Sequence, residues 1–366
     1  MTTSTPSLQP VFDRINQYIA AGEMDGAALA VAHRGVQVCE WVGGNAAPNH
    51  VASANTLWPL ASISKTYAAT MVMTLVQSGE LGLAHRVTTN LPGFHGGDKD
   101  LITLRHLLTH TSGIMYESPF NSDRIATGWT VAQIVEESFT FPLMFYPGAG
   151  FSYSDWNYGL AGQIAAAMLG STFPQLVHER VLAPAGLTNT FMGTPDAEHA
   201  RMAQVSDCWG FGTPGDMYNS PNGRRLGYPS TGCAATINDL LKFGMLFRAE
   251  SDNHVLSRAT RRAMATDQIG GGAIGSSPPD WDTRHRRAVA WGLGFWIQGA
   301  NNPGAFGDLM PIGTFGHGGA SGCALTINPV DDIVIAFVSN RHANSGRERW
   351  SQRITGVQNG VMAALT

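Results

Sequence analysis

Lysine is scarce in this chain: only three occur among its 366 residues, at positions 65, 99 and 242. Charged residues of both signs make up only 14% of the sequence, and the formal net charge is −4. This composition leaves no basic stripe, which argues against nucleic acid as a partner. With 43% hydrophobic residues, the chain is expected to fold as one large globular domain or two ordinary ones.

Cysteine is also rare, and its four positions are far apart. Cys39, Cys208, Cys233 and Cys323 form neither a C-x-x-C metal motif nor an obvious disulfide framework, so four free thiols are predicted.

Long apolar runs are missing. No stretch reaches the roughly 18 residues that a membrane span requires. The first six residues lack the basic and apolar regions of a signal peptide. We therefore expect a cytoplasmic protein with no membrane partner.

Several common catalytic motifs are absent as well. His106 and His110 have the spacing of two zinc ligands, but Leu107 occupies the place of the glutamate in H-E-x-x-H, so His110 is interpreted as a hydrogen-bonding structural residue. The stretch Gly319-Ala-Ser-Gly is one residue too short for a G-x-S-x-G elbow. No nucleotide-binding loop follows a strand in a suitable context. We expect no metal and no cofactor.

The stretch Ser62-Ile-Ser-Lys65 is the most informative motif that is present. Residues three apart on a helix share a face, so the serine hydroxyl and the lysine amine can meet. Helix formers follow from residue 67 and Gly79 offers a stop, which places Ser62 in the first turn of a helix. The positive end of the helix dipole there favours an anion and disfavours the lysine cation. The alternative is a surface lysine beside a capping serine.

Antiparallel strands are predicted near both ends of the chain. Strands at 27–32 and 36–42 form one expected hairpin, and strands at 323–328 and 333–338 form another. An amphipathic helix at residues 8–19 precedes the first hairpin, and a closing helix follows the second at about 345–364.

The middle of the chain shows mainly helical patterns, near residues 101–110, 130–138, 157–169 and 172–182. The predicted fold class is therefore α/β of the α+β type: an antiparallel sheet flanked by terminal helices, with an inserted helical region. We assign residues 1–80 plus 225–366 to the sheet domain and 81–224 to the insertion, with the active site between them.

Three stretches rich in glycine, proline and asparagine are predicted to be long loops that carry binding surface, at about 210–230, 268–283 and 298–313. Four aromatic residues lie on or beside them. They either line an apolar substrate cleft or pack the loops onto the core: Trp209, Tyr218, Tyr228 and Trp281.

The order of short motifs resembles one family across nearly the whole chain: the serine β-lactamases and penicillin-recognising enzymes, in the class C-like branch that contains carboxylesterases, D-amino acid amidases and D-peptidases. The matching stretches are Thr56-Leu-Trp-Pro-Leu-Ala-Ser-Ile-Ser-Lys, His106-Leu-Leu-Thr-His-Thr-Ser-Gly, Phe151-Ser-Tyr-Ser-Asp, Gly227-Tyr-Pro-Ser-Thr-Gly and Phe315-Gly-His-Gly-Gly-Ala.

This resemblance implies a β-lactamase/transpeptidase-like fold and assigns roles to single residues. Ser62 is the expected nucleophile, with Lys65 as its base and Tyr153 as the catalytic tyrosine, although a buried phenol that only packs is the alternative for Tyr153. The backbone N–H groups of Ser62 and Ala320 are expected to hold the oxyanion. Substrate contacts are expected along the third motif, His317, Gly318 and Gly319.

Two departures from the family pattern limit the prediction of the substrate. Asp155 stands where asparagine is usual; an ionised carboxylate there raises the pKa of Lys65, unless Asp155 is protonated or turned toward an ammonium on the substrate. His317 stands where classical β-lactamases carry a lysine for the antibiotic's carboxylate, and a histidine is mostly neutral near pH 7.

We therefore predict a serine hydrolase that cleaves small-molecule esters or amides through an acyl-enzyme. The alternatives are a D-amino acid amidase or D-aminopeptidase, a β-lactamase, or a non-enzymatic sensor or scaffold of the penicillin-binding type. The oligomeric state stays open.

Overall fold

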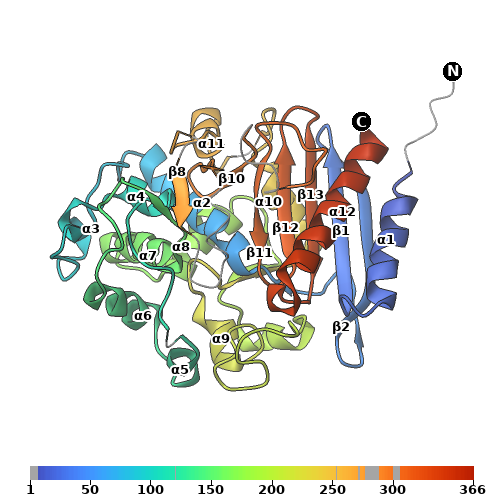
Figure 1. The fold of residues 1–366 in the computed structure, drawn as a ribbon, viewed down its shortest axis with the longest axis horizontal. Helices are drawn as coiled ribbons and strands as arrows, with labels where there is room; N and C mark the ends of the chain where they lie inside the picture. Colours follow the sequence, from blue (N-terminus) through green and yellow to red (C-terminus); the bar gives the residue numbers. More distant parts are fainter. Residues whose placement is uncertain (1–6, 120, 253, 271–272, 277–287, 300–305) are drawn as a thin grey trace.

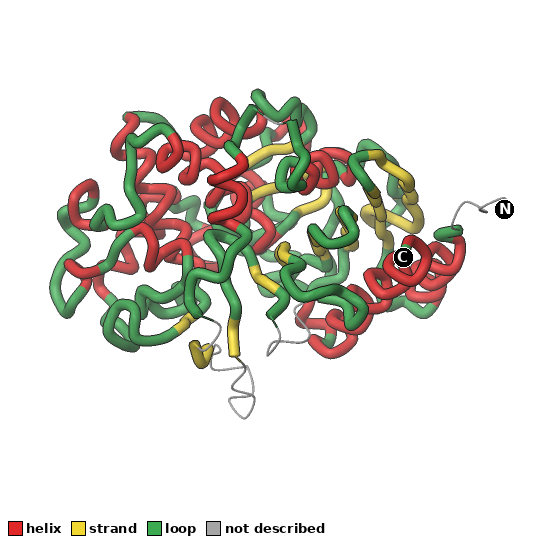
Figure 2. Tube along the Cα trace, turned by 90° about the horizontal axis from the view of Figure 1, so that it is seen from above, coloured by secondary structure: helices red, strands yellow, loops and turns green. Residues whose placement is uncertain are grey.

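A computed structural model describes residues 7–366 except 120, 253, 271–272, 277–287 and 300–305. A seven-stranded sheet lies toward one end of the molecule and a group of helices toward the other (Figure 1). Viewed from above, the strands lie between that group and the two terminal helices (Figure 2). The sheet order is β10 (Trp296–Ile297), β11 (Phe315–Gly319), β12 (Cys323–Asn328), β13 (Ile333–Ser339), β1 (Gly26–His33), β2 (Val36–Ala47) and β3 (His50–Val51).

Strand β1 joins the two ends of the chain, because it pairs antiparallel with β2 on one side and with β13 on the other. Its residues alternate between two cores, as the two-residue period of a strand requires. Leu29 faces the core under α1 (Gln9–Ala20) and α12 (Arg347–Leu365), whereas Ala30 faces the larger core on the opposite side. The predicted terminal helices and both predicted hairpins are confirmed.

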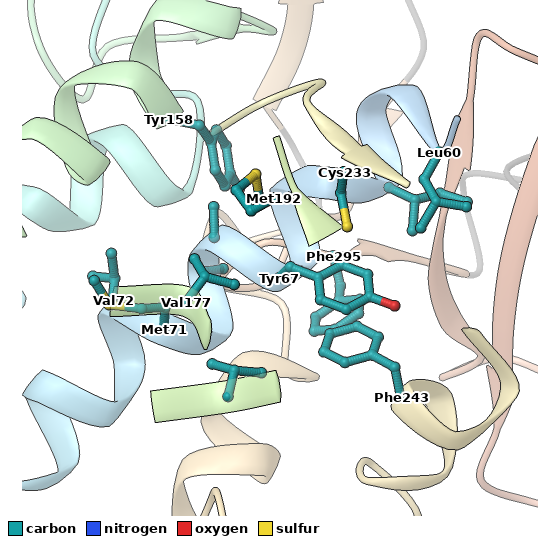
Figure 3. Close-up of a cluster of buried hydrophobic side chains, with 14 of the residues drawn as sticks. Leu60, Tyr67, Met71, Val72, Tyr158, Val177, Met192, Cys233, Phe243 and Phe295 are labelled. Atoms are coloured by element: carbon teal, nitrogen blue, oxygen red, sulfur yellow. The ribbon is translucent and has the colours of Figure 1, made fainter. Parts of the chain in front are cut away.

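The larger core is built around α2 (Ser64–Gln77), whose residues from Ser64 to Leu75 are all buried. Tyr67 of α2 stacks on Phe243 of α10 (Ile237–Met245) with ring centroids 3.7 Å apart, and Phe295 lies beside them (Figure 3). A helix enclosed on all sides holds its side chains in fixed positions, which suits a helix that carries Lys65.

The helical region packs around α7 (Asp155–Leu169), which contacts α2 and four other helices. The four predicted helical patterns are confirmed, although the last continues as a π-helical turn, His178–Leu182. The division into two domains stays a prediction. The four helices that contact α7 besides α2 are α3 (Val87–Asn90), α4 (Leu104–Leu108), α6 (Val131–Glu137) and α8 (Phe173–Val177), and the helical region also contains α5 (Asn121–Ala126).

Two of the predicted loops contain regular structure that the sequence did not reveal. In the first loop, α9 (Pro221–Leu226) forms where Ser220 caps its N-terminus. In the second, β8 (Ala273–Ser276) pairs with β5 (Phe151–Ser152) and with β9 (Ala288–Val289). A second small sheet has the order β4 (Trp58–Pro59), β7 (Cys233–Ala235) and β6 (Thr190–Met192). Helix α11 spans Arg258–Met264.

The three loop aromatics that the structure describes differ in burial, and their cleft-lining role stays a prediction. Tyr218 and Tyr228 are buried, Trp209 is 59% exposed, and Trp281 lies outside the described residues. The four cysteines are free thiols, as predicted. Within the described ranges, no helix is long and apolar enough to cross a membrane.

Candidate active site

Ser62 lies in a 3₁₀ turn, Ala61–Ile63, and α2 begins two residues later at Ser64. The prediction that Ser62 lies in the first α-helical turn is therefore wrong by two residues. The difference arises at Ala61, whose φ of 47° is in the left-handed region that L-residues seldom adopt. The expected contact is present, since Lys65 Nζ lies 3.2 Å from Ser62 Oγ.

The segment before Ser62 is held from two sides. On one side, the Leu60 N–H donates to the Cys233 carbonyl of β7 at 2.8 Å. On the other, the Ser321 hydroxyl donates to the Pro59 carbonyl at 2.6 Å. A Cβ atom at Gly319 would lie 2.2 Å from the Leu60 carbonyl oxygen, so only glycine fits at the end of β11. The nucleophile is thus fixed between β7 and β11.

Lys65 is fully buried, and its amine has three polar neighbours. Nζ lies 2.5 Å from Asp155 Oδ1 and 3.3 Å from the Ser230 carbonyl oxygen, in addition to the Ser62 hydroxyl. These three acceptors match the three donors of an ammonium group. Burial lowers the pKa of Lys65 below its ordinary value, while the Asp155 carboxylate opposes that shift. Lys65 therefore becomes the neutral amine that a general base requires at a lower pH than an exposed lysine does.

Asp155 points at the lysine in this structure. It is the first residue of α7, where the helix dipole favours a negative charge. Its backbone N–H donates to the Tyr116 carbonyl at 2.7 Å, which fixes the start of the helix.

Tyr153 is 7% exposed and packs on the His110 ring, with centroids 4.5 Å apart. The Lys65 amine lies 4.6 Å from the centre of the tyrosine ring. The phenol, the lysine and the serine therefore form one cluster, as the catalytic assignment predicts, while the proton-transfer role of Tyr153 stays a prediction.

His110 contacts this cluster through the Tyr153 ring. Its Nδ1 accepts hydrogen bonds from the Ser154 N–H at 3.0 Å and from Asn157 Nδ2 at 3.1 Å, which fixes the proton on Nε2. Burial and the nearby Lys65 charge hold the pKa of His110 well below its usual range. Its interpretation as a hydrogen-bonding structural residue is confirmed.

His106 caps α4 instead of approaching His110: its Nδ1 accepts from the Thr103 N–H at 3.2 Å. In the part of the chain that the structure describes, no group of three or more His, Cys, Asp or Glu side chains is placed to hold a metal ion.

His317 lies in the middle of β11 and is 2% exposed. Its Nδ1 lies 2.7 Å from the Gly318 carbonyl oxygen, so Nδ1 carries the proton and Nε2 is an acceptor. Among the described residues, Nε2 has no hydrogen-bond partner. Burial lowers the pKa of His317 to about 3, with the Lys65 charge acting in the same direction. The site therefore has no cation at this position.

The remaining third-motif residues follow His317 directly. A Cβ at Gly318 would lie 3.1 Å from the Trp350 ring, so β11 packs tightly against α12. Ala320 packs in the same small apolar cluster as Ala61, which places it next to the nucleophile segment. Its carbonyl accepts from the Ala343 N–H at 2.8 Å. The oxyanion role of the Ser62 and Ala320 amides stays a prediction.

Glu117 was not predicted from the sequence; it follows Tyr116, whose carbonyl accepts the Asp155 N–H at the start of α7. Its Oε2 accepts from Asn121 Nδ2 at 2.6 Å. Burial raises the pKa of Glu117 to about 8, and the Asp155 charge adds to this shift. Its position four residues after the His110-Thr-Ser-Gly113 stretch was the only available signal.

Comparisons with known proteins identify the family of this chain. The family model described as "Beta-lactamase" matches residues 11–358. Penicillin-binding protein 4 of Amycolatopsis lactamdurans is 27% identical over 338 residues, which cover 87% of this chain and 78% of the relative. Esterase EstB of Burkholderia gladioli is 27% identical over 326 residues, covering 78% of each chain.

Solved structures show the same fold. EstCE1, described as a hydrolase with promiscuous acyltransferase activity, has a TM-score of 0.76 at 21% identity and covers 96% of this chain and 98% of its own. A penicillin-binding protein homologue from Caulobacter crescentus has a TM-score of 0.77 at 23% identity, covering 96% and 97%. The fold is thus that of serine β-lactamases and penicillin-binding proteins. This chain belongs to the Beta-lactamase family, as its motifs suggested.

Proposed function

We propose that this protein is a serine hydrolase that cleaves small esters or amides through an acyl-enzyme on Ser62. The observation that carries the proposal is the buried Lys65 amine, with its lowered pKa, 3.2 Å from the Ser62 hydroxyl. A base next to a serine is the arrangement that nucleophilic catalysis requires. Membership of a family whose named relatives include an esterase and β-lactamases supports it.

The reaction is proposed to have two stages. Ser62 Oγ bonds to the acyl carbon while its proton passes to neutral Lys65, and Tyr153 lies in the same cluster. The proton then moves to the departing alcohol or amine. Backbone amides of Ser62 and Ala320 stabilise the oxyanion. Water then attacks the acyl-enzyme, which releases the acid and returns the proton to Ser62.

The neutral His317 favours esters or amides over classical β-lactams, because no cation stands ready at that position for an antibiotic's carboxylate. A D-amino acid amidase or D-aminopeptidase is the second candidate, and it is favoured by the two carboxyl groups near Lys65. The cytoplasmic location expected from the sequence stays a prediction.

A fluorophosphonate probe with mass spectrometry tests the enzyme proposal. We expect a phosphonate on Ser62 of the intact protein and none in Ser62→Ala, while Ser78→Ala, a substitution at the end of α2, labels normally. An unlabelled Ser62, or equal labelling of Ser62→Ala, contradicts the proposal. Hydrolysis of p-nitrophenyl esters with slow turnover of a chromogenic cephalosporin is expected, and the reverse preference would identify a β-lactamase.

A further inference from the structure

A cavity of about 520 Å³ lies outside the active site, between the loop at residues 95–99 and the segment at residues 140–146. Its volume is within the range that small-molecule ligands occupy. The second wall is mainly apolar and includes the rings of Phe141, Phe145 and Tyr146. The first wall contains Lys99, one of only three lysines in the chain. The cavity therefore combines an apolar surface with a cationic side chain.

Lys99 is a buried cation, since only 6% of the residue is exposed. Its Nζ donates to the Phe139 carbonyl at 2.5 Å and lies 5.7 Å from the centre of the Phe94 ring. None of the ion pairs among the described residues includes Lys99. An ammonium has three N–H donors, so two of them remain for a ligand. Burial lowers the pKa of Lys99, as expected for a cation that is removed from water.

The other two lysines differ from Lys99. The buried Lys65 amine contacts three acceptors, including the Asp155 carboxylate. Lys242 is exposed on α10, where water solvates its charge. Only Lys99 combines burial with the absence of a carboxylate partner in the described part of the chain. A buried cation without an anion costs free energy, and an anion bound in the cavity would offset that cost.

The residues around the cavity select the kind of anion. A carboxylate has two oxygens, which match in number the two remaining N–H donors of Lys99. A dianion such as phosphate is disfavoured, because Asp98 also lines the cavity and Asp100 is exposed in the same loop. The aromatic rings of the opposite wall favour a ligand with an apolar body. Charge and lining together therefore fit a monocarboxylate with an apolar group.

We propose that this cavity is a second ligand site, which binds a small monocarboxylate with its oxygens on the Lys99 ammonium and its apolar body against Phe141 and Phe145. No acyl transfer is needed for this binding. The inference therefore goes beyond the proposed hydrolase function and does not depend on it.

The apolar wall of the cavity is attached to the stretch that contains His110. The Met144 N–H donates to the Gly113 carbonyl at 2.7 Å, and the Gly148 N–H donates to the Thr111 carbonyl at 2.7 Å. A Cβ atom at Gly113 would lie 2.1 Å from the Phe145 carbonyl oxygen, so the two segments are in close contact. A ligand in the cavity thus lies against a segment that packs directly on an active-site motif.

Calorimetric titration tests the site with phenylacetate and with 2-phenylethanol, a neutral compound of similar size without an ester or amide bond. We expect phenylacetate to bind the unaltered protein about tenfold more tightly, because it adds a charge-assisted hydrogen bond. Lys99→Met keeps the length of the side chain and removes its charge, so the two compounds should bind this variant equally. Lys242→Met is the matched control and should keep the difference. Equal affinities or no binding in the unaltered protein, or a difference that persists in Lys99→Met, overturns the inference.

A chemical measurement on the unaltered protein covers the case in which Lys99→Met does not fold. Reductive methylation with formaldehyde is followed at each lysine by mass spectrometry. Phenylacetate is expected to slow the methylation of Lys99 and to leave that of the exposed Lys242 unchanged, whereas 2-phenylethanol at the same concentration protects Lys99 less. If Lys99 reacts equally fast with and without phenylacetate, or never reacts, the carboxylate does not bind at this amine and the inference is wrong.

Discussion

The contact between Lys65 and Asp155 determines at which pH the proposed base becomes active. Only the neutral amine can accept the Ser62 proton, and a carboxylate 2.5 Å away favours the charged form. Replacing Asp155 with Asn keeps the shape of the side chain and removes its charge. Burial of Lys65 is then opposed only by the smaller effect of the Glu117 charge, so the pKa of the lysine falls further.

The size of this effect follows from the geometry. An opposite charge at such a distance typically shifts a pKa by about one to three units, and each unit corresponds to about 1.4 kcal/mol. We therefore expect the acidic limb of the kcat/KM profile, which reports the free enzyme, to move down by at least about one pH unit in Asp155→Asn. Below the midpoint of that limb, the variant is then faster than the unaltered protein.

The assay is ester hydrolysis with p-nitrophenyl acetate across the pH range in which the protein stays folded. Asp332→Asn serves as the matched control, because Asp332 also forms an ion pair, with Arg248, but lies in the turn between β12 and β13 and is not a partner of Lys65. In Asp332→Asn, the acidic limb of the kcat/KM profile is expected to stay at the same pH as in the unaltered protein. A limb in Asp155→Asn that stays where it was, or moves to higher pH, would refute the assignment of Lys65 as the base.

Three further predictions concern positioning and stability. His110→Phe keeps an aromatic ring but leaves the buried Ser154 N–H unpaired. The free energy of unfolding in urea should therefore fall by about 1–3 kcal/mol, and kcat for ester hydrolysis should also fall. If both values stayed unchanged, the supporting role of His110 would be contradicted. His342 has a folded pKa of about 4 against an ordinary 6.5, so the unfolded chain binds more protons between those values and stability falls as the pH drops below about 6.5. Its share at pH 5 is about 2 kcal/mol, and His342→Gln should show a correspondingly smaller loss between pH 7 and pH 5. Phe243→Ala removes the ring stacked on Tyr67 and should cost about 3–5 kcal/mol in denaturant unfolding; a loss below about 1 kcal/mol would mean that the core closes around the gap.

Features that depend on neighbours in the sequence were predicted well. The Ser62–Lys65 contact follows from three-residue spacing, and the terminal hairpins follow from short apolar runs separated by turn residues. The 3₁₀ turn at Ser62 was missed because it depends on the left-handed backbone of Ala61, which alanine does not signal.

Several contacts between distant segments were not predicted from the sequence. Ser230 reaches Lys65 across 165 residues, and Glu117 reaches the site because the neighbouring Tyr116 carbonyl binds the start of α7. Glu117 has no local pattern that distinguishes it from ordinary loop positions. Ser230 lies in the family-like stretch Gly227-Tyr-Pro-Ser-Thr-Gly, but that resemblance assigned it no contact with the lysine. The direction of Asp155 was likewise open until the structure placed its carboxylate on the lysine.

The pairing of β1 with β13 has a consequence for folding during synthesis of the chain. Ala27 lies opposite Ser339, so during synthesis from the N-terminus the first hairpin, complete at Ala47, exists long before its partner strand, which ends at Ser339. Throughout that interval, one apolar edge of β1 has no neighbour and is open to strands of other chains. Chains cut short before β13 are therefore expected to aggregate through this edge.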